Sequence, residues 1–189
     1  MEPGVWSPAI AATMERPVEE LKDFERVVGT YRPLVFRFIL ASLRDRDAAE
    51  NLTQDCFFKA YRHRAQFRGD SAVKTWLMQI AANLVRDTTR TRRFQFWRRA
   101  TTISSDDLLN TVSSETSPET ATLRRDQLCA IWKATDRLSE KQRSVFLLRF
   151  VEDMELLEIA EVLNMTEGTV KKHLFRALHA VRQRMGRLT

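Results

Sequence analysis

The side chains best suited to act on another molecule lie near the C-terminus, where cations, imidazoles and one phenyl ring share a predicted helix face. Apolar residues recur at spacings of three and four from Val170 to Val181, which predicts a helix with one buried side. Its other side presents Thr169, Lys171, Lys172, His173, Phe175, Arg176 and His179. Cations contact phosphates, polar groups read base edges, and an aromatic ring can contact a thymine methyl group. We therefore expect this face to bind the major groove of DNA.

The residues before this helix complete a helix-turn-helix pattern. Leu156 to Leu163 forms a short apolar helix, and Asn164 suits the left-handed conformation that ends it. Thr166 can cap the next helix, which runs to about Met185. A plain surface helix is the alternative, and the combined turn signals, charge and spacing disfavour it. Many regulators share this motif, so it predicts DNA binding and little else.

Positive charge is concentrated in two separate patches of a chain whose formal net charge is +6. Residues 168–189 hold six basic side chains and no acid, and residues 86–99 hold six arginines against one acid. Two such patches indicate a polyanionic partner contacted by both halves of the chain. Solvated helix faces remain the alternative for either patch taken alone.

The composition predicts an all-α fold. The 189 residues are 43% hydrophobic and include only five glycines and five prolines, fewer turn signals than a sheet-rich fold needs. Cys56 and Cys129 lack disulfide or metal-site spacing, and no phosphate-binding loop or nucleophile pair is present. We therefore expect no metal, no cofactor, no small-molecule substrate and no enzymatic activity. Without a signal-peptide core or a long apolar run, a cytoplasmic location is expected.

A segment rich in serine, threonine and acids, residues 101–122, divides the chain. It contains eleven Ser or Thr, four acids and no Lys or Arg, so it cannot bury enough apolar surface to order itself. We predict a flexible acidic linker there. It joins two small helical domains, residues 18–100 and 123–189, and residues 1–17 form a flexible N-terminal extension.

Helical spacing predicts three helices before this linker. The first runs from Val18 to Leu43 and the second from Asp47 to Arg64. Cys56 falls on the inward line of the second helix, which favours packing over a redox role. The third helix follows a turn that Gly69 permits, and it carries Trp76 on its core face rather than as a stacking wedge.

Four helices are predicted after the linker. The first spans about residues 123–137, and the second follows Ser139 and Gln142, which have capping-box spacing, and extends through Phe150. The last two form the helix-turn-helix.

Three runs of residues before the linker and two after it resemble one protein family. The first half contains DAAENLTQDCFFKAY from Asp47, FRGDSAVKTWL from Phe67 and IAAN from Ile80. In this order, these runs resemble domain two of the extracytoplasmic-function (ECF) sigma factors of bacterial RNA polymerase, which are sigma-E-like proteins. The second half contains LSEKQR from Leu138 and EGTVKK from Glu167, which resemble domain four of the same family. The resemblance covers about Phe24 to Arg184.

The resemblance implies a polymerase-binding face on the helix from Asp47 to Arg64. That face would dock on the clamp helices of the largest subunit of core RNA polymerase, and domain four would contact the polymerase flap. The implied contact residues are Glu50, Asn51, Gln54, Asp55 and Phe58. A polar surface around an exposed aromatic ring suits a protein interface. The family usually has an acid where this chain has Asn51.

The resemblance also implies two DNA sites. A base of the minus-ten element would be flipped beside the loop at Phe67, and phosphates would meet the basic run that follows. The implied minus-ten residues are Phe67, Arg68, Gly69, Asp70, Ser71, Lys74, Asn83, Arg86 and Arg90. The C-terminal helix would read the minus-thirty-five element. His173 and Leu178 occupy positions where relatives often carry arginine, so the base preference cannot be copied from them.

The resemblance therefore implies an alternative sigma factor, which binds core polymerase, directs it to a two-part promoter and performs no bond chemistry. Its partners would be core RNA polymerase, promoter DNA and an anti-sigma factor, which is often anchored in the membrane. The rival interpretation is a helix-turn-helix transcription factor of the response-regulator kind, since EGTVK resembles its recognition helix. The first half lacks the strand and helix alternation that a receiver domain needs.

Overall fold

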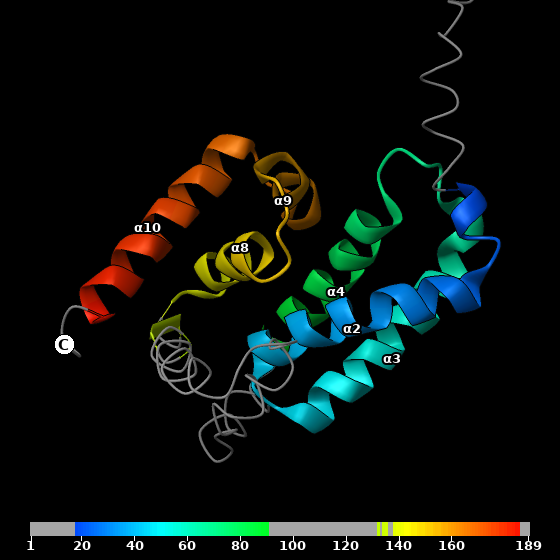
Figure 1. The fold of residues 1–189 in the computed structure, drawn as a ribbon, viewed down its shortest axis with the longest axis horizontal. Coiled ribbons are helices and arrows are strands. Elements are labelled where there is room, and N and C mark those ends of the chain that lie inside the picture. The colour runs from blue at the N-terminus through cyan, green and yellow to red at the C-terminus, as the bar shows by residue number, and fades with distance from the viewer. Residues whose placement is uncertain (1–17, 91–131, 133, 136–137, 186–189) are drawn as a thin grey trace, which may run out of the picture.

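The computed structural model describes residues 18–90, 132, 134–135 and 138–185, and every regular element among them is a helix (Figure 1). The expected N-terminal extension, the acidic linker and most of the predicted helix over residues 123–137 lie outside these residues. Trp132, Ala134 and Thr135 are helical. The predicted all-α class is confirmed.

The first long helix, α2 (Phe24–Leu43), begins later than its sequence pattern predicts. Asp23 caps it by accepting a hydrogen bond from the backbone N–H of Arg26 at 3.1 Å, so residues 18–20 form a separate helical turn. The helix continues through Pro33 and ends at Arg44, whose φ of 58° lets its N–H bond to the carbonyl of Leu40. Val18 is helical as predicted, but the predicted continuous helix is interrupted at residues 21–23, because the local cap at Asp23 starts a new helix.

The next two helices lie where the sequence places them, within one or two residues. Helix α3 (Arg46–His63) is capped by Asp45, and a short 3-10 turn, η1 (Arg64–Gln66), follows it. Gly69 then turns the chain with a φ of 78°, a conformation that only glycine adopts easily. Helix α4 (Val73–Arg90) completes the first half.

The helices described after residue 138 begin and end at the predicted signals. Helix α8 (Glu140–Phe150) starts at a capping box between Ser139 and Gln142. Helix α9 (Leu156–Leu163) ends at Asn164, which adopts a φ of 51°. Helix α10 (Glu167–Met185) starts where the Thr166 hydroxyl accepts from the N–H of Thr169 at 3.3 Å. The helix-turn-helix is thus α9 and α10.

The two halves pack against each other. One continuous cluster of buried side chains contains Phe38 and Leu77 of the first half together with Leu147, Met154 and Ile159 of the second. Across this contact, α9 packs on α4 and α8 packs on α2; Figure 1 shows α8 and α9 together on one side of the first-half helices. A smaller cluster fixes α10 against α8; it contains Ala134, Leu138, Phe146, Ala177 and Val181.

Cys56 lies in the interior of the first half. Its side chain is fully buried and its thiol donates to the carbonyl oxygen of Leu77 at 3.6 Å, so the expected packing role is confirmed. Burial raises the pKa of the Cys56 thiol to about 12, although nearby Lys59 opposes the shift.

Cys56 is therefore expected to resist alkylation in the folded protein. At pH 8 the thiol is protonated and inaccessible, so iodoacetamide should modify it only after the chain is unfolded. Peptide mass spectrometry of native and denatured samples measures this difference. Rapid native labelling of Cys56 would contradict the buried position and reopen the redox interpretation.

Candidate functional site

The outer face of α10 presents the basic and aromatic residues that the sequence predicts. Lys171, Lys172, Arg176 and His179 are exposed, and Phe175 is the most exposed large apolar side chain in the described residues, at 72%. The rings of Phe175 and His179 are stacked with centroids 6.5 Å apart. Lys171 also pairs with Glu167 at 2.6 Å, a surface contact that contributes little to stability.

The inner face of the same helix is packed as predicted. Val170, Ala177 and Val181 are buried, and Leu174 and Leu178 are partly buried against the two apolar clusters. Leu178 therefore faces inward rather than lying on the outer face with the cations. At the start of α10, the hydroxyl oxygens of Thr166 and Thr169 lie 2.8 Å apart, so Thr169 helps to begin the helix as well as bordering its outer face.

His173 lies between these two faces and is half-buried. Burial lowers its pKa, and the nearby cations Lys141, Arg176 and Lys172 lower it further. Its Nδ1 finds no hydrogen-bond partner within the described part of the chain. At neutral pH the imidazole is therefore uncharged, and it supplies a polar edge beside the exposed cations of α10.

The outward face of α3 is polar with one large ring at its centre. Asn51, Gln54 and Asp55 are exposed, and the Phe58 ring is 62% exposed, with the guanidinium of Arg62 5.7 Å from its centroid. Glu50 is half-buried and pairs with Arg46 at 3.2 Å. An exposed phenyl ring surrounded by polar groups is typical of the centre of a protein interface.

A cavity of about 380 Å³ lies beside the loop at Phe67. The Phe67 ring contacts that of Trp76, with centroids 4.9 Å apart, and both rings line the cavity. Trp76 is half-buried, so it packs on the core, as predicted, and also presents a surface to the cavity. The full lining is Lys59, His63, Gln66, Phe67, Trp76, Ile80 and Asn83.

Sequence reasoning missed the contribution of α3 to this cavity. Lys59 and His63 are one helical turn apart, and the Oε1 of Gln66 accepts a hydrogen bond from His63 Nδ1 at 3.2 Å. Their spacing of four could have placed Lys59 and His63 on one face of the helix. Nothing in the pattern indicated that this face turns toward Trp76.

The other predicted minus-ten residues lie in the loop after η1 and along α4. Arg68 and Asp70 are exposed in the loop, where Gly69 is buried and Ser71 is half-buried. Asn83 and Arg86 are exposed on α4 and bond to each other at 2.8 Å, with the exposed Arg90 one turn beyond them.

Lys74 has a different environment. Its Nζ donates to the backbone carbonyl of Glu152, in the loop between α8 and α9, at 2.7 Å. In this arrangement its ammonium group bonds to the second half of the chain instead of facing solvent.

The predicted sites lie on different sides of the molecule. Helix α10 packs on α8 and α9, whereas α3 packs on α2 and α4, on the far side of the core (Figure 1). Within the described residues, no cluster of three or more potential metal ligands occurs. None of the helices described is long and apolar enough to cross a membrane.

Two family models match the chain, one in each half. Residues 27–95 match Sigma-70 region 2, and residues 130–181 match Sigma-70 region 4. These ranges contain the α3 face, the cavity at Phe67 and most of α10.

Curated and solved proteins give the same grouping. The chain is 32% identical over 166 residues to the RNA polymerase sigma-H factor of Pseudomonas aeruginosa, covering 85% of this chain and 84% of that protein. It is 27% identical over 165 residues to the ECF RNA polymerase sigma factor SigW of Bacillus subtilis, covering 86% and 88%. Its fold is similar to that of the sigma factor RpoE solved in complex with the anti-sigma factor NepR from Bartonella quintana, with a TM-score of 0.66. The two sequences are 24% identical, and the match covers 87% of this chain and 98% of that one.

Proposed function

Because this chain belongs to the extracytoplasmic-function (ECF) sigma factors of bacterial RNA polymerase, we propose that its exposed faces form one polymerase-binding surface and two promoter-binding sites. Residues 18–100 form the unit that binds core polymerase and the minus-ten element. Residues 123–189 form the unit that binds the minus-thirty-five element, and residues 101–122 connect the two. The family consists of transcription regulators rather than enzymes, and the matches give no support to a response-regulator function.

The α3 face is the proposed docking surface for the polymerase clamp helices. Phe58 carries the proposal, because its ring is 62% exposed at the centre of a polar face, the position that aromatic anchors take in protein interfaces. The residues Glu50, Asn51, Gln54 and Asp55 around it would form a polar rim. The neutral Asn51 gives this rim one acid fewer than is usual in the family.

The cavity beside Phe67 is the proposed pocket for a flipped base of the minus-ten element. Its wall combines the Phe67 and Trp76 rings, which can stack on a base, with the amides of Gln66 and Asn83, which can bond to a base edge. Flipping a base requires a few kcal/mol, and phosphate contacts from Arg86 and Arg90 would offset this requirement.

The outer face of α10 is the proposed reader of the minus-thirty-five element. Lys171, Lys172 and Arg176 would contact phosphates and guanine acceptors, while Phe175 and His179 would make apolar and edge contacts. Each good base contact contributes about 1–3 kcal/mol of discrimination, so two or three such contacts give modest specificity on their own.

Replacing His173 with arginine is expected to make promoter binding tighter and more dependent on salt. The substitution adds a cation at a position that is uncharged at neutral pH, and one more phosphate contact steepens the slope of log K against log salt by about 0.9. Holoenzyme binding to a promoter fragment at several salt concentrations measures the slope. Thr30→Arg, on the exposed surface of α2, is the matched control and should leave the slope unchanged. An unchanged slope in His173→Arg would mean that this side chain does not face DNA.

We further propose control by an anti-sigma factor that covers these exposed faces, with the protein acting in the bacterial cytoplasm. The structurally similar Bartonella quintana protein was solved with such a partner. The exposed Phe58 and Phe175 are the apolar contacts that such an inhibitor would be expected to cover here.

Binding to core RNA polymerase tests the proposed function. A dye-labelled sample should bind purified core enzyme with an affinity that a housekeeping sigma factor reduces by competition. It should also show no phosphatase, nuclease or nucleotide-hydrolysis activity. Absence of binding to core would contradict the proposal.

A further inference from the structure

A buried ion pair joins the two halves of the protein. The Glu152 side chain, in the loop between α8 and α9, has no exposed surface, and its carboxylate accepts two hydrogen bonds from Arg37 of α2. The Nε of Arg37 lies 2.9 Å from Oε1, and Nη2 lies 2.7 Å from Oε2. This two-pronged geometry is the strongest arrangement for such a pair.

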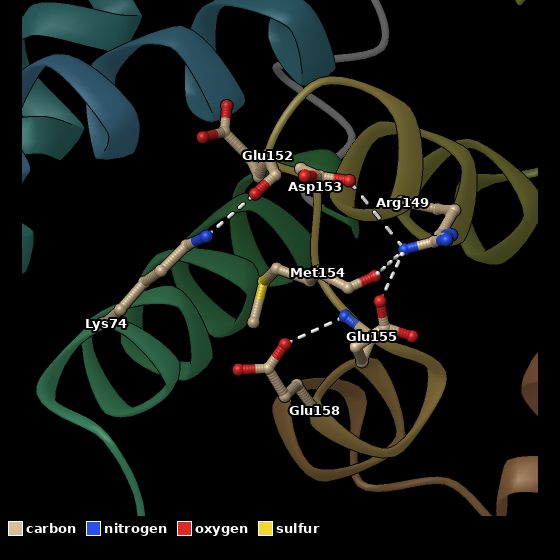
Figure 2. Close-up of polar contacts among 7 residues, drawn as sticks. All are labelled: Lys74, Arg149, Glu152, Asp153, Met154, Glu155 and Glu158. Carbon is tan, nitrogen blue, oxygen red and sulfur yellow. Dashed lines mark hydrogen bonds and ion pairs between the residues drawn. The ribbon is translucent and has the colours of Figure 1, made fainter.

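The backbone of the same glutamate is held from another direction. Figure 2 shows Lys74 reaching from α4 to the carbonyl oxygen of Glu152, while the Glu152 side chain points away from α4. Two cations on two helices of the first half thus meet at one residue of the second half. We call Arg37, Lys74 and Glu152 the clasp.

Further hydrogen bonds join the two halves. Arg44 donates to the carbonyl of Trp132 at 2.6 Å, and the buried Arg143 donates to the carbonyl of Ser42 at 3.4 Å. Thr89 of α4 bonds to Glu140 of α8 at 3.2 Å. These hydrogen bonds across the contact reduce the cost of burying the polar groups that make them.

The closed arrangement also occupies the proposed minus-ten surface. Lys74 is bonded within the clasp, and a second cavity of about 380 Å³ lies between α4 and the second half. Its lining includes three of the proposed minus-ten residues, Asn83, Arg86 and Arg90, opposite Glu140 and Lys141. A nucleic-acid strand that follows α4 would therefore meet the second half.

The closed form is also too short to read both promoter elements. By their names these elements are about 25 base pairs apart, and a rise of about 3.4 Å per base pair separates them by about 85 Å. A compact chain of 189 residues has a radius of gyration of about 16 Å and is roughly 40 Å across. The segment 91–131 can covalently span the difference, since its extended length is on the order of 140 Å at about 3.4 Å per residue.

We propose that the clasp holds the protein in an autoinhibited closed form, and that the halves must separate at Glu152 before the promoter can be read. The effect on promoter binding rests on the proposed function, whereas the closed form itself rests on the contacts between the two halves. A buried ion pair suits a reversible device, because its attraction is nearly balanced by the hydration that both groups regain on opening. Loss of one partner leaves the other charge buried, which favours the open form.

The test measures the distance between the halves. Donor and acceptor dyes are attached to two introduced cysteines at exposed positions, Thr30→Cys on α2 and Gln183→Cys on α10. Cys129 is replaced by serine so that it is not labelled, and Cys56 is protected by its burial. Glu152→Gln removes the charge and keeps the size of the side chain. Asp153→Asn is the matched control, because Asp153 is 97% exposed and asparagine also tolerates its φ of 48°. Glu152→Gln should lower energy transfer toward that of the core-bound protein, and Asp153→Asn should not.

A double-substitution cycle separates the clasp from general damage to the fold. Arg37→Gln should open the protein as Glu152→Gln does, and the two together should open it little further than either alone. Circular dichroism should show unchanged helix content in each variant. Apparent affinity for core polymerase should rise several-fold in the open variants, in proportion to the open fraction. If the distance between the dyes stays short in both single variants, the clasp is overturned, whatever the outcome of polymerase binding. If the distance increases but the protein does not bind polymerase, only the proposed function is overturned.

Discussion

Replacing Phe58 with alanine should weaken binding to core RNA polymerase by about 30-fold. Aromatic side chains at the centre of an interface commonly contribute about 2 kcal/mol, and this is the most exposed ring on α3, at 62%. Because the ring is already largely in water, its removal should change the free energy of unfolding by less than about 0.5 kcal/mol. Titration of labelled protein with core enzyme measures the affinity, and urea unfolding measures the stability.

Phe175→Ala is the matched control for Phe58→Ala. Both changes delete a largely exposed phenyl ring, one on α3 and one on α10. Phe175→Ala should leave core binding intact and weaken the binding of the holoenzyme to promoter DNA. Equal losses of core binding in the two variants would contradict the assignment of the two faces.

Replacing Phe38 with alanine should lower the free energy of unfolding by about 3–5 kcal/mol. Phe38 has no exposed surface and lies in the cluster shared by the two halves, so its removal leaves a cavity that the helices cannot close. That loss is a large fraction of the 5–15 kcal/mol typical of a whole domain. Urea unfolding followed by circular dichroism measures it. A change below about 1 kcal/mol would mean that α2 does not pack as described.

The helices and their ends were largely predictable because their signals are local. Ser139 with Gln142, Asn164 and Thr166 each act on the adjacent turn, and the structure uses all four as the sequence predicts. The exception, the start of α2, is also local: Asp23 caps a new helix within an unbroken apolar pattern. The exposed faces of α3 and α10 follow from the same periodicity.

The contact between the halves was not predictable, because it depends on residues far apart in the chain. Arg37 and Glu152 are separated by 115 positions, and each alone reads as an ordinary charge on a helix or in a loop. Periodicity identifies a buried face and does not identify its partner. For the same reason Lys74 was predicted as a DNA contact, and its bond to the second half was missed.

The cavity beside Phe67 was predictable in part. The loop and Gly69 were identified from their turn chemistry, but Lys59, His63 and Gln66 join them only because α3 packs against α4. Crossing of two helices is a tertiary property that a single sequence pattern does not contain.

Run-off transcription with purified core polymerase tests the central claim most directly. Fragmented genomic DNA from the source bacterium serves as template, with and without this protein, and the 5′ ends of the transcripts are sequenced. We predict a set of start sites that requires the protein and shares two upstream sequence elements. At protein concentrations near the dissociation constant for core, the set should become much weaker with Phe58→Ala, and it should shift or weaken with Phe175→Ala. Transcription that is the same with and without the protein, despite its binding to core, would contradict the account.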